Sequence, residues 1–209
     1  MCGRLNILAN ILNNQVSDEL RVRYNTTDNP DLCPSQIVTT LCKNFSPRSS
    51  TNGLQQYEMT WGIKPAWAKK LLINAQVETA MEKPTWRNAM QHRRCIVPCS
   101  GWFEWRDEGG LSKQKYLFSH AESKPLYMAG LWFEPSEGEQ PELVTLTTAA
   151  NTVCQPYHHR MPLLVSVNEI EDWLGNQKPI ELLLDQLSQA QNRASNHTLL
   201  SINPTNVPA

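Results

Sequence analysis

The sequence predicts an α+β fold in which a few helices flank a mainly antiparallel, barrel-like β-sheet. Two observations support this: short segments rich in β-branched and aromatic residues recur along the chain, and only three segments resemble helices. Apolar residues make up 40% of the chain and charged residues 19%, which excludes a disordered protein. A chain of 209 residues suits one domain of generous size, so we expect a single domain over residues 1–209.

The first third of the chain is predicted to hold one helix and two strands. Val16–Tyr24 has the spacing of a short amphipathic helix, whereas Ile37–Cys42 and Tyr57–Ile63 combine β-branched and aromatic residues as strands do. The polar, breaker-rich segment Ser46–Gly53 between these strands is predicted to be a surface loop.

The rest of the chain is predicted to hold five more strands and two helices. The predicted strands are Cys95–Pro98, Trp102–Arg106, Lys115–Ser119, Leu126–Phe133 and Leu143–Thr148. The predicted helices are Asn168–Leu174 and Pro179–Gln189. Asn168 is the expected N-cap of the first of these helices, and Gly175 is expected to end it.

The N-terminal and apolar segments indicate where the protein resides. A basic stretch followed by an apolar stretch is missing at the N-terminus, and no apolar run reaches about 18 residues. We therefore expect no secretory signal, no transmembrane helix, no membrane partner and a cytoplasmic or nucleoid location.

The cysteine spacing argues against a metal site. The six cysteines form no Cys-x-x-Cys pair, and no histidine stands at zinc-ligand spacing from them: they are Cys2, Cys33, Cys42, Cys95, Cys99 and Cys154. In a reducing compartment most should be free, buried thiols. We expect neither a structural metal nor any other cofactor.

Charge is distributed unevenly along a nearly neutral chain. The net charge of −1 argues against a generally basic nucleic-acid-binding surface. Residues 60–120 hold ten Lys or Arg against five Asp or Glu, while residues 121–209 hold four against ten. This pattern could give one electropositive face, although on charge alone ordinary surface charge explains it better.

Cys2 has a distinctive chemistry if methionine aminopeptidase removes Met1. The free α-amine and the thiol then form a 1,2-aminothiol, and both groups are partly deprotonated near neutral pH. Such a pair attacks an aldehyde twice, because the amine forms a Schiff base and the thiolate then closes a five-membered thiazolidine ring. Taken alone, Cys2 is better explained as an ordinary cysteine near a frayed terminus.

Two further segments carry candidate acid–base groups. Glu104 stands between Phe103 and Trp105 on a predicted strand, and desolvation by aromatic neighbours raises the pKa of a carboxyl. The alternative is a strand glutamate that faces water. His158 and Arg160 suit a proton shuttle beside a phosphate ligand, or else a solvated surface loop.

The tryptophans gather in the basic part of the chain. Five of the seven lie between positions 61 and 105. Tryptophan interleaved with Lys and Arg suits unstacked bases and phosphates, although most of these five are expected in the core. Trp67 and Trp105 are the two that we expect to be exposed, since each lies beside a turn or a polar candidate.

Several short motifs follow one another in a recognisable order. They are Cys2-Gly3-Arg4, Tyr24-Asn25, Pro34-Ser35-Gln36, Trp61-Gly62-Ile63 with Pro65 and Trp67, Asn74-Ala75 with Glu78-Thr79, Arg93-Arg94-Cys95, Gly101-Trp102-Phe103-Glu104-Trp105, Thr147-Thr148-Ala149 and His158-x-Arg160-Met161-Pro162. Nearly from end to end, the sequence resembles the SRAP family, named for SOS response-associated peptidase. The resemblance implies an SRAP-like fold and covalent capture of abasic sites in single-stranded DNA, which shields the lesion during the DNA damage response.

The resemblance also implies catalytic roles. Cys2 would supply the amine and the thiol that form a thiazolidine with the deoxyribose aldehyde. Glu104 would shuttle protons during Schiff-base formation, and Asn74 would hydrogen-bond the terminal amine or the sugar. His158 would help open the sugar ring, and it is preferred to His159 because the family spacing is His-x-Arg-Met-Pro.

Further residues are implied in DNA binding. Arg4, Thr148 and Arg160 would contact phosphates, while Trp67 and Trp105 would hold the strand bent at the lesion. The partner would be single-stranded DNA with abasic sites, including its junctions with duplex, bound by a monomer.

Gln76 departs from the family pattern, in which Arg commonly stands two residues after the asparagine. A charge-assisted phosphate contact would be lost, which weakens DNA binding by about 1–2 kcal/mol and leaves the chemistry unchanged.

Two other functions use the same residues. A cysteine peptidase could employ Cys2, His158 and Glu104 as nucleophile, base and orienting group, and self-removal of Met1 or a lyase-type activity is compatible with that set. A non-covalent single-stranded DNA-binding protein would use only the aromatic and basic groups. A peptidase needs an oxyanion hole and a peptide groove, for which the sequence gives no sign. A non-covalent DNA-binding protein would leave Cys2 and Glu104 without a role.

Overall fold

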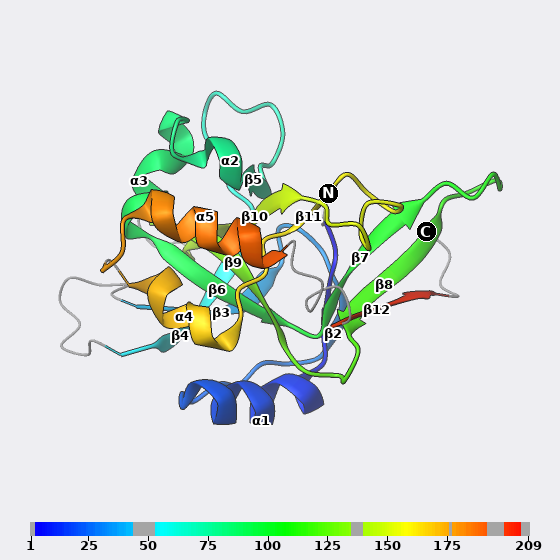
Figure 1. The fold of residues 1–209 in the computed structure, drawn as a ribbon, viewed down its shortest axis with the longest axis horizontal. Coiled ribbons are helices and arrows are strands. Elements are labelled where there is room, and N and C mark those ends of the chain that lie inside the picture. The colour runs from blue at the N-terminus through cyan, green and yellow to red at the C-terminus, as the bar shows by residue number, and fades with distance from the viewer. Residues whose placement is uncertain (1–2, 44–52, 135–139, 176, 192–198, 206–209) are drawn as a thin grey trace.

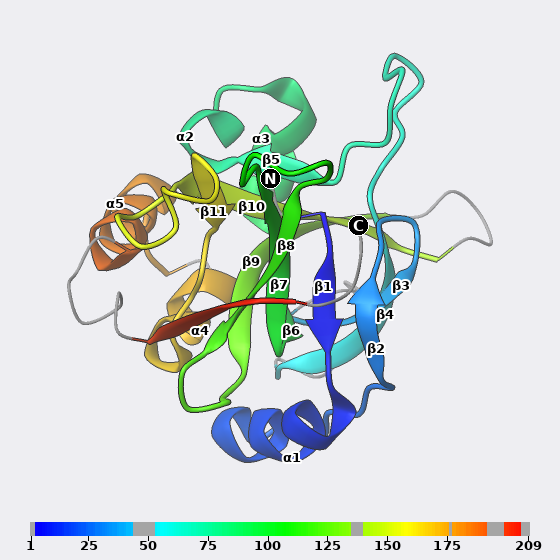
Figure 2. The same cartoon turned by 90° about the vertical axis from the view of Figure 1, so that its right-hand side faces the viewer.

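Two β-sheets form the frame of the molecule in the computed structural model, which describes residues 3–43, 53–134, 140–175, 177–191 and 199–205 (Figures 1 and 2). The elements in chain order are β1 (Leu5–Ile7), α1 (Ala9–Leu20), β2 (Asn29–Leu32), β3 (Ile37–Cys42), β4 (Gln55–Trp61), β5 (Asn74–Gln76), α2 (Val77–Ala80), α3 (Pro84–His92), β6 (Arg94–Cys99), β7 (Gly101–Arg106), β8 (Gln114–His120), β9 (Leu126–Phe133), β10 (Glu142–Ala149), β11 (Arg160–Pro162), α4 (Val167–Leu174), α5 (Ile180–Gln191) and β12 (Leu200–Pro204).

The larger sheet closes on itself. Its strand order is β11-β10-β4-β3-β6-β9, and β9 also pairs with β10 from Glu142 opposite Phe133 to Thr145 opposite Gly130. The strands β10, β4, β3, β6 and β9 therefore form a ring. Pairing is antiparallel except where β10 runs parallel to β4 and β5. The predicted α+β class with a mainly antiparallel, barrel-like sheet is confirmed.

The smaller sheet, in the order β12-β8-β7-β1-β2, is antiparallel throughout. The chain enters it from the barrel at Ser100, between β6 and β7, and the Ser100 N–H donates to the carbonyl of Asn6 at 2.9 Å. Gly101 follows, and a β-carbon there would lie 2.3 Å from the carbonyl oxygen of Phe118. Only glycine therefore allows β8 to approach β7 this closely.

One apolar cluster runs through both sheets and beneath the helices. Trp61 and Trp102 are fully buried, the first in the barrel and the second in the smaller sheet. α1 contributes Leu12 and Val16, which lie four residues apart on one helical face. α4 contributes Trp173, whose indole N–H donates to the carbonyl of Cys95 at 2.9 Å. This cluster fixes the helices against the barrel.

The structure corrects two predicted helix details. The helix predicted at Val16–Tyr24 is α1, which starts at Ala9 and ends at Leu20 because Arg21 adopts the left-handed conformation (φ 51°). The expected N-cap Asn168 is wrong, since Ser166 holds that position, whereas the prediction that Gly175 ends α4 is confirmed.

Strand predictions were most accurate where the segment of β-branched and aromatic residues was long. β3 and β9 have the predicted bounds. The other predicted strands, β4, β6, β7, β8 and β10, differ from prediction by one or two residues at one or both ends. The predicted loop Ser46–Gly53 lies almost wholly outside the described residues. Within the part of the chain that the structure describes, no helix combines the length and apolarity needed to span a bilayer.

Candidate active site

Several segments that carry predicted site residues meet at one end of the molecule. The beginning of β1, β5, β11 and the C-terminal end of β10 lie together there in both views (Figures 1 and 2). β7 joins them because its Phe103 N–H donates to the carbonyl of Arg4 at 3.1 Å, just before β1. The segment between β4 and β5, which carries Trp67, rises from the same end.

Glu104 is buried on β7, with only 4% of the residue exposed. It pairs with Tyr116 of β8, so its side chain lies on the sheet face that also carries Trp102 and Phe118, whose rings stack at 4.9 Å. Desolvation by this burial raises the pKa of the carboxyl to about 7. At neutral pH Glu104 therefore populates both its neutral and its charged form, as a proton shuttle requires.

The loop between β10 and β11 packs against this face and brings His158 to it. Tyr157 and His158 both donate their backbone N–H groups to the carbonyl of Cys154, at 2.9 and 3.1 Å. The Tyr157 ring lies edge-on against Tyr116, with centroids 4.8 Å apart. Burial raises the pKa of the Cys154 thiol to about 12, and the nearby charge of Glu104 adds to this. Cys154 is thus the turn residue that places His158 near Glu104.

Two backbone atoms of Arg160 lie against Nδ1 of the His158 ring. The backbone N–H donates to Nδ1 at 2.9 Å, which favours the tautomer with its proton on Nε2, while the carbonyl oxygen lies 3.1 Å from the same nitrogen. Desolvation lowers the pKa of His158, and the ring stacks on that of His159 at 4.3 Å. At neutral pH the ring is therefore uncharged, and in the favoured tautomer it offers an Nε2–H donor.

Asn74 and Gln76 begin and end the short strand β5. Asn74 pairs with Thr145 of β10, and its side-chain oxygen accepts a hydrogen bond from the Thr145 hydroxyl. This contact turns the amide nitrogen of Asn74 away from Thr145. Asn74 can therefore act toward a substrate as a hydrogen-bond donor, through that nitrogen. Gln76 is exposed opposite Thr147.

Arg160 and Thr148 share one carboxylate partner. Glu78 accepts hydrogen bonds from Arg160 Nη1 at 2.9 Å and Nη2 at 2.7 Å, and from the Thr148 hydroxyl at 3.4 Å. Thr148 is buried and only 12% of the Arg160 side chain is exposed. The charge of Arg160 is therefore balanced within the protein.

The opposite face of β7 holds a second charged cluster. Asp31 accepts hydrogen bonds from Arg4 Nη1 at 3.0 Å and from Lys115 Nζ at 2.7 Å. Lys115 is buried, with its ammonium 4.0 Å from the Phe103 ring centroid and 5.5 Å from that of Trp105. This cluster fixes the course of the chain at Arg4, directly before β1.

The two tryptophans chosen from the sequence differ in exposure. Trp67 is exposed (67%) on the segment between β4 and β5, where Lys64, Lys69 and Lys70 are exposed too. Trp105 is only half-buried, so the expectation that it is exposed is wrong. The Trp67 segment therefore combines a free aromatic face with exposed positive charge.

Cys2, the predicted nucleophile, lies outside the described residues. The structure does describe Gly3 and Arg4, and it places the Arg4 carbonyl against the neighbour of Glu104. Two residues of extended chain span about 7 Å, so a residue two positions before Arg4 has the reach to meet Glu104.

Sequence reasoning gave no role to four residues of this end: Glu78, Asp31, Lys115 and Cys154. Glu78 had a signal, because it stands in the motif that begins at Asn74. Asp31 and Lys115 are 84 positions apart and had no sequence signal, since only the folding of β2 and β8 toward β7 brings them together. Among the described residues, no cluster of His, Cys, Asp and Glu is suited to hold a metal ion.

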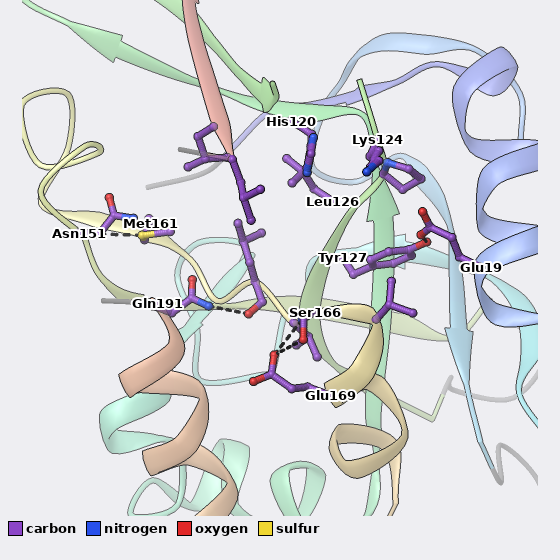
Figure 3. Close-up of a pocket in the computed structure, with 16 residues that line it drawn as sticks. Glu19, His120, Lys124, Leu126, Tyr127, Asn151, Met161, Ser166, Glu169 and Gln191 are labelled. Atoms are coloured by element: carbon purple, nitrogen blue, oxygen red, sulfur yellow. Dashed lines mark hydrogen bonds between the residues drawn. The ribbon is translucent and has the colours of Figure 1, made fainter. Parts of the chain in front are cut away.

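A cavity of about 210 Å³ lies elsewhere, between α1, α4, α5 and the start of β12 (Figure 3). Its wall includes Glu19, which accepts from the Tyr127 hydroxyl at 2.5 Å, and Gln191, which donates to the Leu164 carbonyl at 2.7 Å. None of the predicted site residues lines this cavity.

Comparison with known proteins identifies the family. The family model described as SOS response associated peptidase (SRAP) matches residues 1–203. The chain belongs to the SRAP family. An SRAP relative, the abasic site processing protein YedK of Escherichia coli, is 39% identical over 54% of this chain and 52% of its own length. The abasic site processing protein YoqW of Bacillus subtilis is 27% identical over 84% of this chain and 80% of its own length.

Solved structures share the SRAP fold. A phage-related protein from Bordetella bronchiseptica superposes with a TM-score of 0.77 at 22% identity, over 99% of this chain and 95% of that one. A second protein from the same organism gives a TM-score of 0.78 at 21% identity, over 99% and 100% of the two chains.

Proposed function

We propose that this SRAP protein captures abasic sites in single-stranded DNA covalently through Cys2, once Met1 has been removed. The observation that carries the proposal is the buried Glu104, with a pKa of about 7, beside the chain that leads back to Cys2. The SRAP relatives YedK and YoqW are named abasic site processing proteins, which supports the same substrate.

The reaction releases one water. The Cys2 amine attacks C1′ of the open-chain deoxyribose, and the hydroxyl of the resulting carbinolamine leaves as water to give a Schiff base. The Cys2 thiolate then attacks the same carbon, and the imine nitrogen takes up a proton as the thiazolidine closes. Glu104 as a carboxylate accepts a proton from the attacking amine, and as a neutral acid it donates one to the departing hydroxyl.

His158 acts earlier, on the closed sugar. Its Nε2–H donor stabilises the ring oxygen as the hemiacetal opens to the aldehyde, and the Arg160 N–H on Nδ1 keeps that proton on Nε2. Asn74 holds the amine or the sugar through its amide nitrogen. Holding both reactants in one geometry contributes on the order of 7 kcal/mol or more.

DNA binding is assigned to the exposed segment around Trp67 and to the residues on either side of it. Trp67 stacks on unpaired bases, while Trp105 supports the bent strand from its half-buried position. Arg4, Thr148 and Arg160 contact phosphates, and Gln76 offers a neutral contact where other SRAP proteins commonly carry arginine. Because Asp31 and Glu78 balance two of these arginines, we expect modest affinity.

The decisive experiment mixes the Met1-free protein with a labelled single-stranded oligonucleotide that carries one abasic site, followed by a denaturing gel. We expect a heat-stable band that needs both Cys2 and the abasic site, with an intact-base oligonucleotide as control. Cys2→Ala keeps the α-amine, so it should give a band only when borohydride traps its Schiff base. No band from a protein whose N-terminus is verified as Cys2 would overturn the proposal and favour a peptidase.

A further inference from the structure

Glu78 joins three elements at the active-site end. It lies in the first turn of α2, directly after β5, and its carboxylate accepts two hydrogen bonds from Arg160 of β11. The same carboxylate accepts the N–H of Ala149 at 3.2 Å and the hydroxyl of Thr148 at 3.4 Å, both at the end of β10. One side chain therefore ties α2 to the point where β10 and β11 pair.

Arg160 links Glu78 to His158. Its Nη2 also donates to the Thr147 carbonyl at 2.6 Å, so the guanidinium is held from two sides. The backbone N–H of the same residue donates to His158 Nδ1 at 2.9 Å. Arg160 is the first residue of the three-residue strand β11 and pairs with Ala149 of β10, so its side-chain contacts add to the backbone pairing at that strand end.

The His158 ring has a competing arrangement within reach. The Arg160 carbonyl lies 3.1 Å from Nδ1, so a ring protonated on Nδ1 could donate to it. That tautomer would leave Nε2 without a proton to donate. A small movement of the Arg160 peptide therefore decides which nitrogen faces the substrate as a donor.

We propose that Glu78 is a positioning residue, which acts through Arg160 to hold His158 with its proton on Nε2. This inference rests on the proposed function, in which His158 opens the sugar ring. Although burial alone would raise the pKa of Glu78, the hydrogen bonds from Arg160 keep that pKa below its ordinary value, so the carboxylate stays charged at neutral pH.

The test replaces the carboxylate by an amide of the same shape, in Glu78→Gln, with Glu171→Gln as the matched control. Glu171 also pairs with a cation, Lys43, but it lies on α4 away from the site. The first readout is the ¹⁵N spectrum of the histidine rings in the free protein. We expect Nδ1 of His158 to be an acceptor in the native and Glu171→Gln proteins, and a mixture of tautomers in Glu78→Gln.

The second readout separates chemistry from binding. The crosslinking rate of Glu78→Gln should fall by about ten- to a hundredfold, because a misplaced catalytic group costs that much. Its affinity for a tetrahydrofuran analogue, which has no aldehyde, should not fall below the native value, because Glu78→Gln removes a charge that balances Arg160. The double variant that carries both Glu78→Gln and Arg160→Gln should crosslink no more slowly than Arg160→Gln alone, since Glu78 acts through Arg160.

An unchanged His158 spectrum together with a near-native rate would overturn the inference. If Glu78→Gln does not fold, Glu78→Asp, which keeps the charge on a shorter side chain, carries the same two readouts with the same criterion. Failure of the native protein to crosslink would overturn the proposed function instead, while the tautomer spectrum would still decide the role of Glu78.

Discussion

Burial moves the pKa values of Glu104 and His158 in opposite directions, and for the same reason. Desolvation disfavours the charged form of each group, so it raises the pKa of Glu104 to about 7 and lowers that of His158. Near neutral pH the site therefore contains a carboxyl that can give or take a proton beside a neutral imidazole that donates from Nε2.

The raised pKa of Glu104 should appear in the stability of the protein. The folded state keeps this proton up to about pH 7, whereas the unfolded chain loses it near 4.5, the ordinary value. Between these values the unfolded state binds fewer protons, so the free energy of unfolding falls as pH rises from about 4.5 to 7. Glu104→Gln should flatten this part of the curve, as measured by urea unfolding. Parallel curves for the two proteins would contradict the assignment.

Gln76 gives a prediction about DNA binding. Gln76→Arg restores a positive charge at an exposed position at the end of β5, so it should strengthen binding to single-stranded DNA by about 1–2 kcal/mol. The logarithm of affinity should also fall more steeply with the logarithm of salt, because one more phosphate is neutralised. Fluorescence anisotropy across salt concentrations measures both the affinity and its salt dependence. An identical slope in the two proteins would contradict this role of position 76.

At the residue scale, sequence reasoning succeeded where the signal was local. A turn beside Trp67 correctly indicated exposure, whereas the sequence left a buried and a water-facing Glu104 as open alternatives. Glu104 is buried, but the aromatic residues on its face are Trp102 and Phe118, since Phe103 and Trp105 lie on the opposite face of β7. The carboxylate partners of Arg4 and Arg160 could not be predicted in this way, since Asp31 and Glu78 stand 27 and 82 positions away from them.

At the element scale, strand length decided what could be predicted. β3 and β9 are six and eight residues long and carry clear apolar runs. The strands β1, β5 and β11 have three residues each, which is too short for a periodic pattern. They form because longer strands offer them unpaired edges, and all three carry or flank residues of the candidate active site.

The start of α4 allows a paired test of capping. The Ser166 hydroxyl lies 2.6 Å from the Glu169 carboxylate, which also accepts the backbone N–H of Ser166 at 3.0 Å. Ser166→Ala should therefore lower the free energy of unfolding by about 1 kcal/mol. Asn168→Ala, two residues later on an exposed position, should change it by less than about 0.5 kcal/mol. Equal losses in chemical denaturation would contradict this assignment of the N-cap.

At the scale of the whole molecule, the closed barrel depends on pairings that no local pattern specifies. β10 pairs in parallel with β4, which lies far away in sequence, whereas its antiparallel pairing with β9 joins two consecutive strands. The count of short strands predicted a barrel-like sheet, but strand order and the separate smaller sheet follow from long-range packing. The turn at Ser100 and Gly101 is where these two sheets are joined.

Gly101 should be sensitive to any side chain. Its β-carbon would lie 2.3 Å from the Phe118 carbonyl oxygen, and a backbone group inside a sheet cannot move aside cheaply. Gly101→Ala should cost about 3 kcal/mol or more. Gly110→Ala is the control, because the nearest atom would be 3.7 Å away in the exposed β7–β8 hairpin. Thermal unfolding compares the two, and similar melting temperatures would show that β8 can shift.

β10 is hydrogen-bonded on both of its edges, by β4 and β5 on one side and by β9 and β11 on the other. Its amide protons can therefore exchange with deuterium only when the surrounding strands separate, which amounts to opening the whole molecule. Peptides from β10 should be among the last to take up deuterium. The threonines that contact Asn74 and Arg160 thus stand on a strand held from both sides, so we expect the geometry of the site to persist through the local fluctuations of the loops around it.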